Sequence, residues 1–76
     1  MNFKYVEKNP NICGGKPVFK RTRIPIYIVL DFLSARESIE NILENYPQLN
    51  REAIWEAIKY ASQLTKLEEE VIEITN

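Results

Sequence analysis

Three stretches of the chain repeat apolar residues at the spacing of an amphipathic helix. In each stretch apolar side chains recur at positions i, i+3, i+4 and i+7, which one face of a helix brings into line. Ser38 and Asn50 stand before the second and third stretches and are suitable N-caps, and Pro47 disfavours helix at the residue before it. About four residues separate the second and third helices, as in a helix-turn-helix. The pattern therefore predicts three helices within residues 24–63, whose apolar stripes begin at Ile26, Ile39 and Ile54.

The chain before these helices has the pattern of a small β-hairpin. Residues 3–7 alternate as a short strand, and residues 18–20 are suitable for a second strand antiparallel to the first. Between them, Gly14 and Gly15 permit positive φ and a tight reversal, and Pro17 stiffens the chain that follows. We therefore predict a β-arm over residues 1–23.

The pattern is ambiguous beyond Ala61. Leu64, Leu67, Val71 and Ile74 fit a helix with 3-4-3 spacing, but residues 71–75 are rich in strand formers. We favour a helix that ends near Leu67 and a short terminal strand after it. The expected fold is mostly α: a short N-terminal β-arm, a three-helix, helix-turn-helix-like bundle, and a possible short C-terminal strand. We treat residues 1–76 as one domain, made of the arm (1–23), the trihelical core (24–63) and an acidic tail (64–76).

The length of the chain bears on its association. A chain of 76 residues buries only roughly 60% of the surface of its unfolded form, so its core is marginal. We therefore expect a homodimer or another partner to add burial. Cys13 is the single cysteine, which agrees with a reducing cytoplasm. The start of the chain lacks a signal-peptide core, and no apolar run approaches the ~18 residues that a membrane span needs, so we expect a cytoplasmic protein without a membrane segment.

The residues needed for most catalytic chemistry are missing from the sequence. There is no histidine, so the commonest general base and metal ligand is absent, and Cys13 has no imidazole to activate it. Gly14, Gly15 and Lys16 resemble part of a phosphate loop, but the rest of that motif is missing. Glu68–Glu70 are consecutive and point in different directions on a helix, which is typical of a solvated face. We expect neither an enzyme nor a metal or other cofactor.

Charge is divided unevenly along the chain. Residues 1–36 hold seven Lys or Arg and two acids, net +5, whereas residues 37–76 hold three Lys or Arg and nine acids, net −6. Such asymmetry is typical of a nucleic-acid surface on one side and an acidic tail on the other. A spread of charge that only keeps a small protein in solution remains the alternative.

Two words of the sequence, GGKPVFKRTRIPI and ENYPQLNREAIWEAIKYA, resemble the family called domain of unknown function 433 (DUF433) over roughly residues 10–62. Arg21 and Arg36 replace glycines of the family signature, and Arg36 should be the C′ residue of the first helix, where left-handed backbone is common. The matching positions are Gly14, Gly15, Lys16, Pro17, Phe19, Lys20, Thr22, Arg23, Ile24, Ile26, Leu33, Ile42, Leu43, Tyr46, Pro47 and Leu49.

The resemblance implies a trihelical, helix-turn-helix-like fold and an antitoxin of a type II toxin–antitoxin pair. Such an antitoxin binds a small PIN-like nuclease toxin. Repression of the antitoxin's own promoter is a further expectation from the resemblance. The alternative is a stand-alone DNA-binding regulator, or a protein-interaction module without a toxin.

DNA binding would rest on basic residues of the arm and of the third helix, which would approach the major groove. The exposed stripe expected on that helix contains Glu52 and Glu56 beside Trp55, Lys59 and Gln63, and its carboxylates would repel a groove unless they contact cytosine. The DNA-binding candidates are Lys16, Lys20, Arg21, Arg23, Arg51 and Lys59.

Protein binding would rest on Trp55 and on the tail. A tryptophan on a helix surface is a good interface anchor, but Trp55 could instead close the edge of the core. A terminal strand could extend the sheet of a partner, or pair with residues 3–7 of its own or a sister chain. The partner-binding candidates are Trp55, Leu67, Val71, Ile72 and Ile74.

Two residues of the arm also have a structural interpretation. Arg23 could be a buried anchor that bonds backbone carbonyls or Asp31, and Thr22 could cap the first helix. Lys20 and Arg21 are then the better candidates for contact with phosphate.

Overall fold

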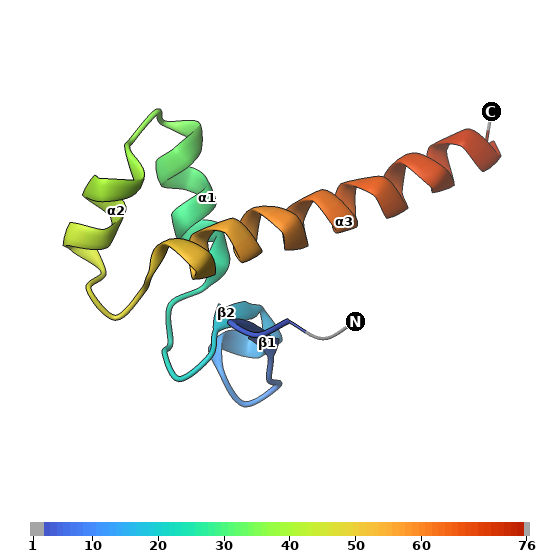
Figure 1. Cartoon of the computed structure of the whole chain (residues 1–76). Helices are drawn as coiled ribbons and strands as arrows, with labels where there is room; N and C mark the ends of the chain where they lie inside the picture. Colours follow the sequence, from blue (N-terminus) through green and yellow to red (C-terminus); the bar gives the residue numbers. More distant parts are fainter. Residues whose placement is uncertain (1–2, 76) are drawn as a thin grey trace.

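The fold is a short hairpin followed by three helices, of which the third is the longest and projects past the rest of the molecule (Figure 1). The computed structural model describes the backbone of residues 3–75 and the side chains of residues 3–67. The predicted class, mostly α with an N-terminal arm, is confirmed. The elements are β1 (Val6–Lys8), the 3-10 turn η1 (Cys13–Gly15), β2 (Pro17–Phe19), α1 (Ile26–Ser34), α2 (Ile39–Asn45) and α3 (Arg51–Thr75).

The two strands pair antiparallel, as predicted, with Val6 opposite Phe19. The pairing begins at Val6 rather than at Phe3, so the predicted start of the first strand is wrong. The reason lies outside the sheet, because the amide groups of residues 4–6 donate to a side chain of α3 that is described below. In the connection, Gly14 and Gly15 have φ of 64° and 84°. This left-handed backbone is the conformation for which the glycine pair was predicted.

The predicted N-caps of α2 and α3, and the predicted end of α2 before Pro47, agree with the observed structure. Ser38 Oγ accepts a hydrogen bond from Asn41 N at 3.0 Å, and Asn50 Oδ1 accepts one from Ala53 N at 2.8 Å, so both residues are N-caps. α2 ends at Asn45, two residues before Pro47. Each cap bonds an amide that has no partner within its helix, which is why a local sequence signal was sufficient to place these helix starts.

The C-terminus of α1 forms a Schellman motif around Arg36. Glu37 N donates to Phe32 O at 2.9 Å, and Arg36 N donates to Leu33 O at 3.0 Å. Arg36 has φ of 68°, the left-handed value expected of a C′ residue. Arg21, the other residue that replaces a family glycine, also has a left-handed φ, of 62°. Both arginines therefore hold backbone that costs an L-residue roughly 1 kcal/mol or more.

The core lies where the arm and the three helices meet. The largest fully buried side chains are Phe19 and Val18 of β2, Val29 of α1, Ile42 of α2 and Ile54 of α3. The apolar stripes predicted for the helices are therefore mostly the faces that pack together, although Leu30 and Leu33 of α1 are only half-buried and Ile58, predicted in the stripe of α3, is exposed. No helix in the described part of the chain is both long and apolar enough to cross a membrane.

The C-terminal strand predicted after Leu67 is wrong, because α3 continues without interruption to Thr75. Packing in the core starts this helix, and each further residue then adds a backbone hydrogen bond without the cost of a new nucleus. Strand propensity mostly reflects packing within a sheet, and the tail has no sheet neighbour in this structure. The predicted contact residues Val71, Ile72 and Ile74 lie outside the described side chains.

Candidate functional site

The side chain of Glu56, the sixth residue of α3, holds the arm against this helix. Its Oε1 accepts hydrogen bonds from Tyr5 N at 2.6 Å and from Val6 N at 3.0 Å, and its Oε2 accepts one from Lys4 N at 3.1 Å. Glu56 is half-buried and not part of an exposed stripe, so that prediction is wrong. Sequence reasoning missed this contact because more than fifty residues separate the partners.

One exposed side of α3 is basic and contains the tryptophan. We call this surface the outer face and define it by the exposed residues Arg51, Trp55, Ile58, Lys59, Ser62 and Lys66. Trp55 exposes 55% of its surface, so the alternative that it closes the edge of the core is wrong. Glu52 stays exposed beside this face, and its carboxylate accepts a 3.3 Å hydrogen bond from the Tyr5 hydroxyl.

Arg51 forms an ion pair with Glu40 of α2, which ties the first turn of α3 to the neighbouring helix. The hydrogen bond from the Arg51 guanidinium holds the pKa of Glu40 below its ordinary value, and the positive charge adds to this effect. Both side chains are largely exposed, so the pair contributes little to stability. Arg51 therefore reaches the outer face with part of its charge already balanced.

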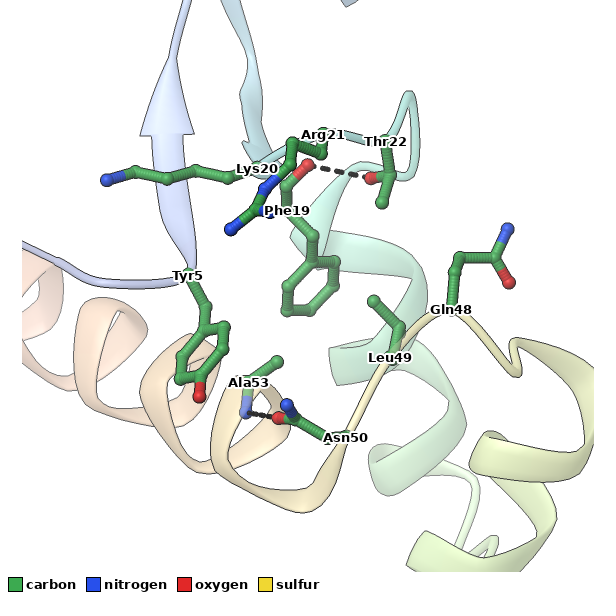
Figure 2. Close-up of a pocket in the computed structure, with 9 residues that line it drawn as sticks. All are labelled: Tyr5, Phe19, Lys20, Arg21, Thr22, Gln48, Leu49, Asn50 and Ala53. Carbon is green, nitrogen blue, oxygen red and sulfur yellow. Dashed lines mark hydrogen bonds between the residues drawn. The ribbon is translucent and has the colours of Figure 1, made fainter.

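A polar cleft of about 320 Å³ separates the turn after β2 from the connection between α2 and α3 (Figure 2). Phe19, Leu49 and Ala53 supply its apolar lining, and Arg21 and Asn50 bring polar groups from its two sides. The other lining residues are Tyr5, Lys20, Thr22 and Gln48. This cleft is where the structure brings Lys20 and Arg21 near the start of α3.

Thr22 stabilises the turn beside the cleft and does not cap a helix. Its hydroxyl donates to Phe19 O at 2.7 Å and accepts from Ile24 N at 3.0 Å, while the residue before α1 is Pro25. Arg23 is exposed, so its predicted role as a buried anchor is also wrong. Its carbonyl accepts a hydrogen bond from the Cys13 thiol at 3.4 Å.

The other basic candidates are scattered, and two of them have contacts within the chain. Lys20 Nζ donates to Phe3 O at 2.8 Å and so holds the arm. The Lys16 ammonium lies 5.5 Å from the centre of the Tyr27 ring, at a different hollow from the polar cleft. Lys59 is exposed on the outer face of α3. The predicted DNA-binding residues therefore do not form one continuous surface.

A second hollow, of about 210 Å³, lies between α1 and α3 and is lined almost entirely by apolar groups. We call it the apolar groove. Tyr27 and Leu64 line it and each exposes 48% of its surface, and Leu67 lies one turn beyond Leu64 with 59% exposed. Sequence reasoning named Leu67 but not Tyr27 or Leu64 as contact residues. The signal that could have identified Leu64 was the apolar stripe of the third helix, which continues beyond the part of the helix that packs in the core. The other lining residues are Lys16, Pro17, Ile26, Leu30, Tyr60 and Ala61.

Among the described residues, no three His, Cys, Asp or Glu side chains are placed so that they could hold a metal ion. The polar cleft and the outer face present cations, amides, hydroxyls and apolar side chains to other molecules.

Comparison with known proteins identifies relatives over most of the chain. The family model DUF433, described as a protein of unknown function, matches residues 6–61. The uncharacterized protein y4eO of Sinorhizobium fredii (strain NBRC 101917 / NGR234) is 43% identical over 56 residues, which are 74% of this chain and 25% of that protein. The chain thus spans a quarter of the length of this curated relative. A crystal structure of a DUF433 member protein from Anabaena variabilis matches with a TM-score of 0.75 and 26% identity, over 90% of this chain and 67% of that chain.

Proposed function

The chain belongs to the DUF433 family of proteins of unknown function, and we propose that it is an antitoxin that binds a PIN-like nuclease toxin through the outer face of α3. The family resemblance of the sequence supports the choice of partner. The exposed Trp55 supports the place of contact, and it is the observation that carries the proposal. The proposed role is binding without catalysis, which agrees with a sequence that has no histidine and a single cysteine.

Trp55 can contribute much of the affinity of such a complex. A tryptophan offers up to about 250 Å², so burying its exposed 55% removes about 140 Å² from water and is worth about 3 kcal/mol. Ile58, one turn further along the outer face, adds apolar surface beside it. Arg51 and Lys59 border this apolar pair and favour a partner surface that carries carboxylates.

Co-expression with the products of neighbouring genes tests this proposal. The tagged chain should recover a small nuclease-like protein, and Trp55→Ala should weaken that complex by about 100-fold, as expected for loss of a central aromatic anchor. Thr65→Ala, at another exposed position of α3, is the matched control and should leave the affinity unchanged. Failure to recover a partner, or equal affinities for the two variants, would contradict the proposal.

DNA binding is a second candidate function, favoured by the position of Glu56. Because this carboxylate is occupied by the arm, the outer face keeps Lys59 and Lys66 without the acid that had been expected among them. Phosphate contacts by these lysines should make the affinity for promoter DNA fall steeply with salt. Lys59→Ala should lower the dependence of affinity on salt by about one phosphate contact.

The matched control for DNA binding is Lys16→Ala, which removes a lysine that lies against Tyr27. Binding that is insensitive to salt, or equal for both variants, would refute a phosphate-contacting role of α3. A chain that binds promoter DNA but recovers no partner would be a stand-alone regulator.

A further inference from the structure

The apolar groove continues along α3 into a surface that the other described residues leave exposed. Tyr27 and Leu64 are about half exposed, and Leu67 is still more exposed. All three lie on or beside one hollow between α1 and α3. Contiguous exposed apolar surface of this kind is typical of an interface.

The described part of α3 does not fold back over this surface. α3 runs straight from the core to Thr75 and leads away from the hairpin and the other helices (Figure 1). The helix beyond Ala61 is about 14 residues long, and an isolated helix of that length is only marginally stable in water. Packing of an apolar face against another molecule would stabilise it.

We propose that a second copy of this chain occupies the apolar groove, and that the two α3 helices pack antiparallel about a two-fold axis near Leu64. In an antiparallel pair of identical helices, a residue of one copy faces the residue of the other copy for which the two residue numbers add up to twice the number of the residue on the axis. With Leu64 opposite its own symmetry mate, Leu67 faces Ala61 of the second copy. The large exposed Leu67 thus meets the small half-buried residue that lines the groove, so the surface is complementary to itself, as a two-fold interface requires.

Charge favours the same arrangement. Glu68 lies one turn beyond Leu64 in α3, and Lys16 of the basic arm lines the groove. With Leu64 at the two-fold axis, Glu68 faces Tyr60 of the second copy, which lines the groove together with Lys16, so opposite charges approach each other. The opposed helix dipoles add a smaller term of the same sign.

This interface is separate from the outer face on which the proposed function rests. Leu64 follows Trp55 by nine residues, which is two and a half turns of a helix, so the two side chains point in opposite directions. A dimer formed through the groove therefore leaves Trp55 open to another partner. The two proposals can fail independently.

The test is the oligomeric state of the isolated chain by sedimentation equilibrium, with two charge-matched variants. The unmodified chain should have twice the 8.9 kDa mass of the single chain. Leu64→Lys should raise the dimer dissociation constant by at least about tenfold, since it places an ammonium in an apolar contact. Ser62→Lys, which adds the same charge on the outer face, should leave the constant unchanged. Both variants should keep the helical circular dichroism of the parent, because both positions are exposed.

A cross-linking experiment keeps the proposal testable if a lysine variant fails to fold. In a Cys13→Ser background, Leu64→Cys exposed to dissolved oxygen as the oxidant should form a disulfide-linked dimer, because the two-fold axis brings the residue next to its own copy. Ser62→Cys should not form this dimer. A monomeric parent chain, equal dissociation constants for the two lysine variants, or cross-linking at position 62 but not at 64 would each overturn the proposal. Loss of a different protein partner on Leu64→Lys from a monomeric parent would assign the groove to that partner.

Discussion

Replacing Glu56 by glutamine tests how the arm is held against α3. The carboxylate accepts hydrogen bonds from the backbone amides of Lys4, Tyr5 and Val6, at distances between 2.6 and 3.1 Å. A glutamine oxygen placed where Oε1 lies can keep the bonds from Tyr5 and Val6. Its NH₂ group would then face the amide of Lys4, so a donor would meet a donor.

The expected loss of stability from Glu56→Gln is about 2 kcal/mol. Hydrogen bonds to a charged acceptor are worth about 1.5–3 kcal/mol each, and the low end of this range applies to a half-buried site. The Glu56→Gln variant loses the hydrogen bond from the Lys4 amide, and the bonds from the Tyr5 and Val6 amides become weaker because the acceptor is no longer charged. Glu56→Ala leaves all three amides without this acceptor and should cost about 4–5 kcal/mol, a large part of the 5–15 kcal/mol that stabilises a typical domain.

The assay is denaturant unfolding followed by far-ultraviolet circular dichroism, together with amide exchange of Tyr5 and Val6. Exchange at these amides should accelerate by about 30-fold in Glu56→Gln, the factor that corresponds to about 2 kcal/mol. Glu52→Gln is the control, because Glu52 accepts only one bond, a 3.3 Å contact with the Tyr5 hydroxyl at an exposed position. If the two variants lose the same stability, the three-bond contact does not hold the arm and the reasoning is refuted.

Three further predictions concern backbone, charge and capping. Arg21→Gly should leave stability unchanged or raise it by up to about 1 kcal/mol, since a φ of 62° strains an L-residue. The control Lys16→Gly, at a φ of −68°, should lower stability by about 0.5–1 kcal/mol. Equal unfolding midpoints of the two variants would contradict the argument. Arg51→Gln should raise the pKa of Glu40 toward its ordinary value in an NMR titration, because the native ion pair lowers that pKa. The pair stabilises the fold at pH values above the pKa of the unfolded chain, and this effect is lost as the pH falls through the pKa of the folded chain. An unchanged pKa of Glu40 in the variant would refute this. Asn50→Ala should destabilise by about 1 kcal/mol, through loss of the N-cap of α3, and an unchanged melting temperature would count against it.

The helices could be predicted because the signals that specify them are local. The apolar stripes, the caps Ser38 and Asn50, and the left-handed position of Arg36 depend on residues within two turns of one another. Membership of the DUF433 family was also predicted from two short sequence segments, and the family model confirms it. The antitoxin role, the DNA contacts and the dimer remain proposals.

The candidate contact surfaces depended on the tertiary structure. Glu56 appeared to be one more polar residue on an exposed helix face until the arm folded over it, since its partners are more than fifty positions away in the chain. The same contact determines which charges remain on the outer face. The sequence also could not show where the core ends, so Leu64 fits a buried stripe although 48% of its surface is exposed beside the groove between α1 and α3.

The sequence by itself determined the order of the hairpin and the three helices, the N-caps of α2 and α3 and the residue types available for chemistry. These properties follow from backbone preferences and periodicity, which act over a few residues. The tertiary structure decided which polar groups are occupied, which apolar groups are left exposed, and that the tail continues a helix. These outcomes depend on which distant segments meet, because a carboxylate, a leucine or a helix end is stabilised only by the neighbours that folding brings to it.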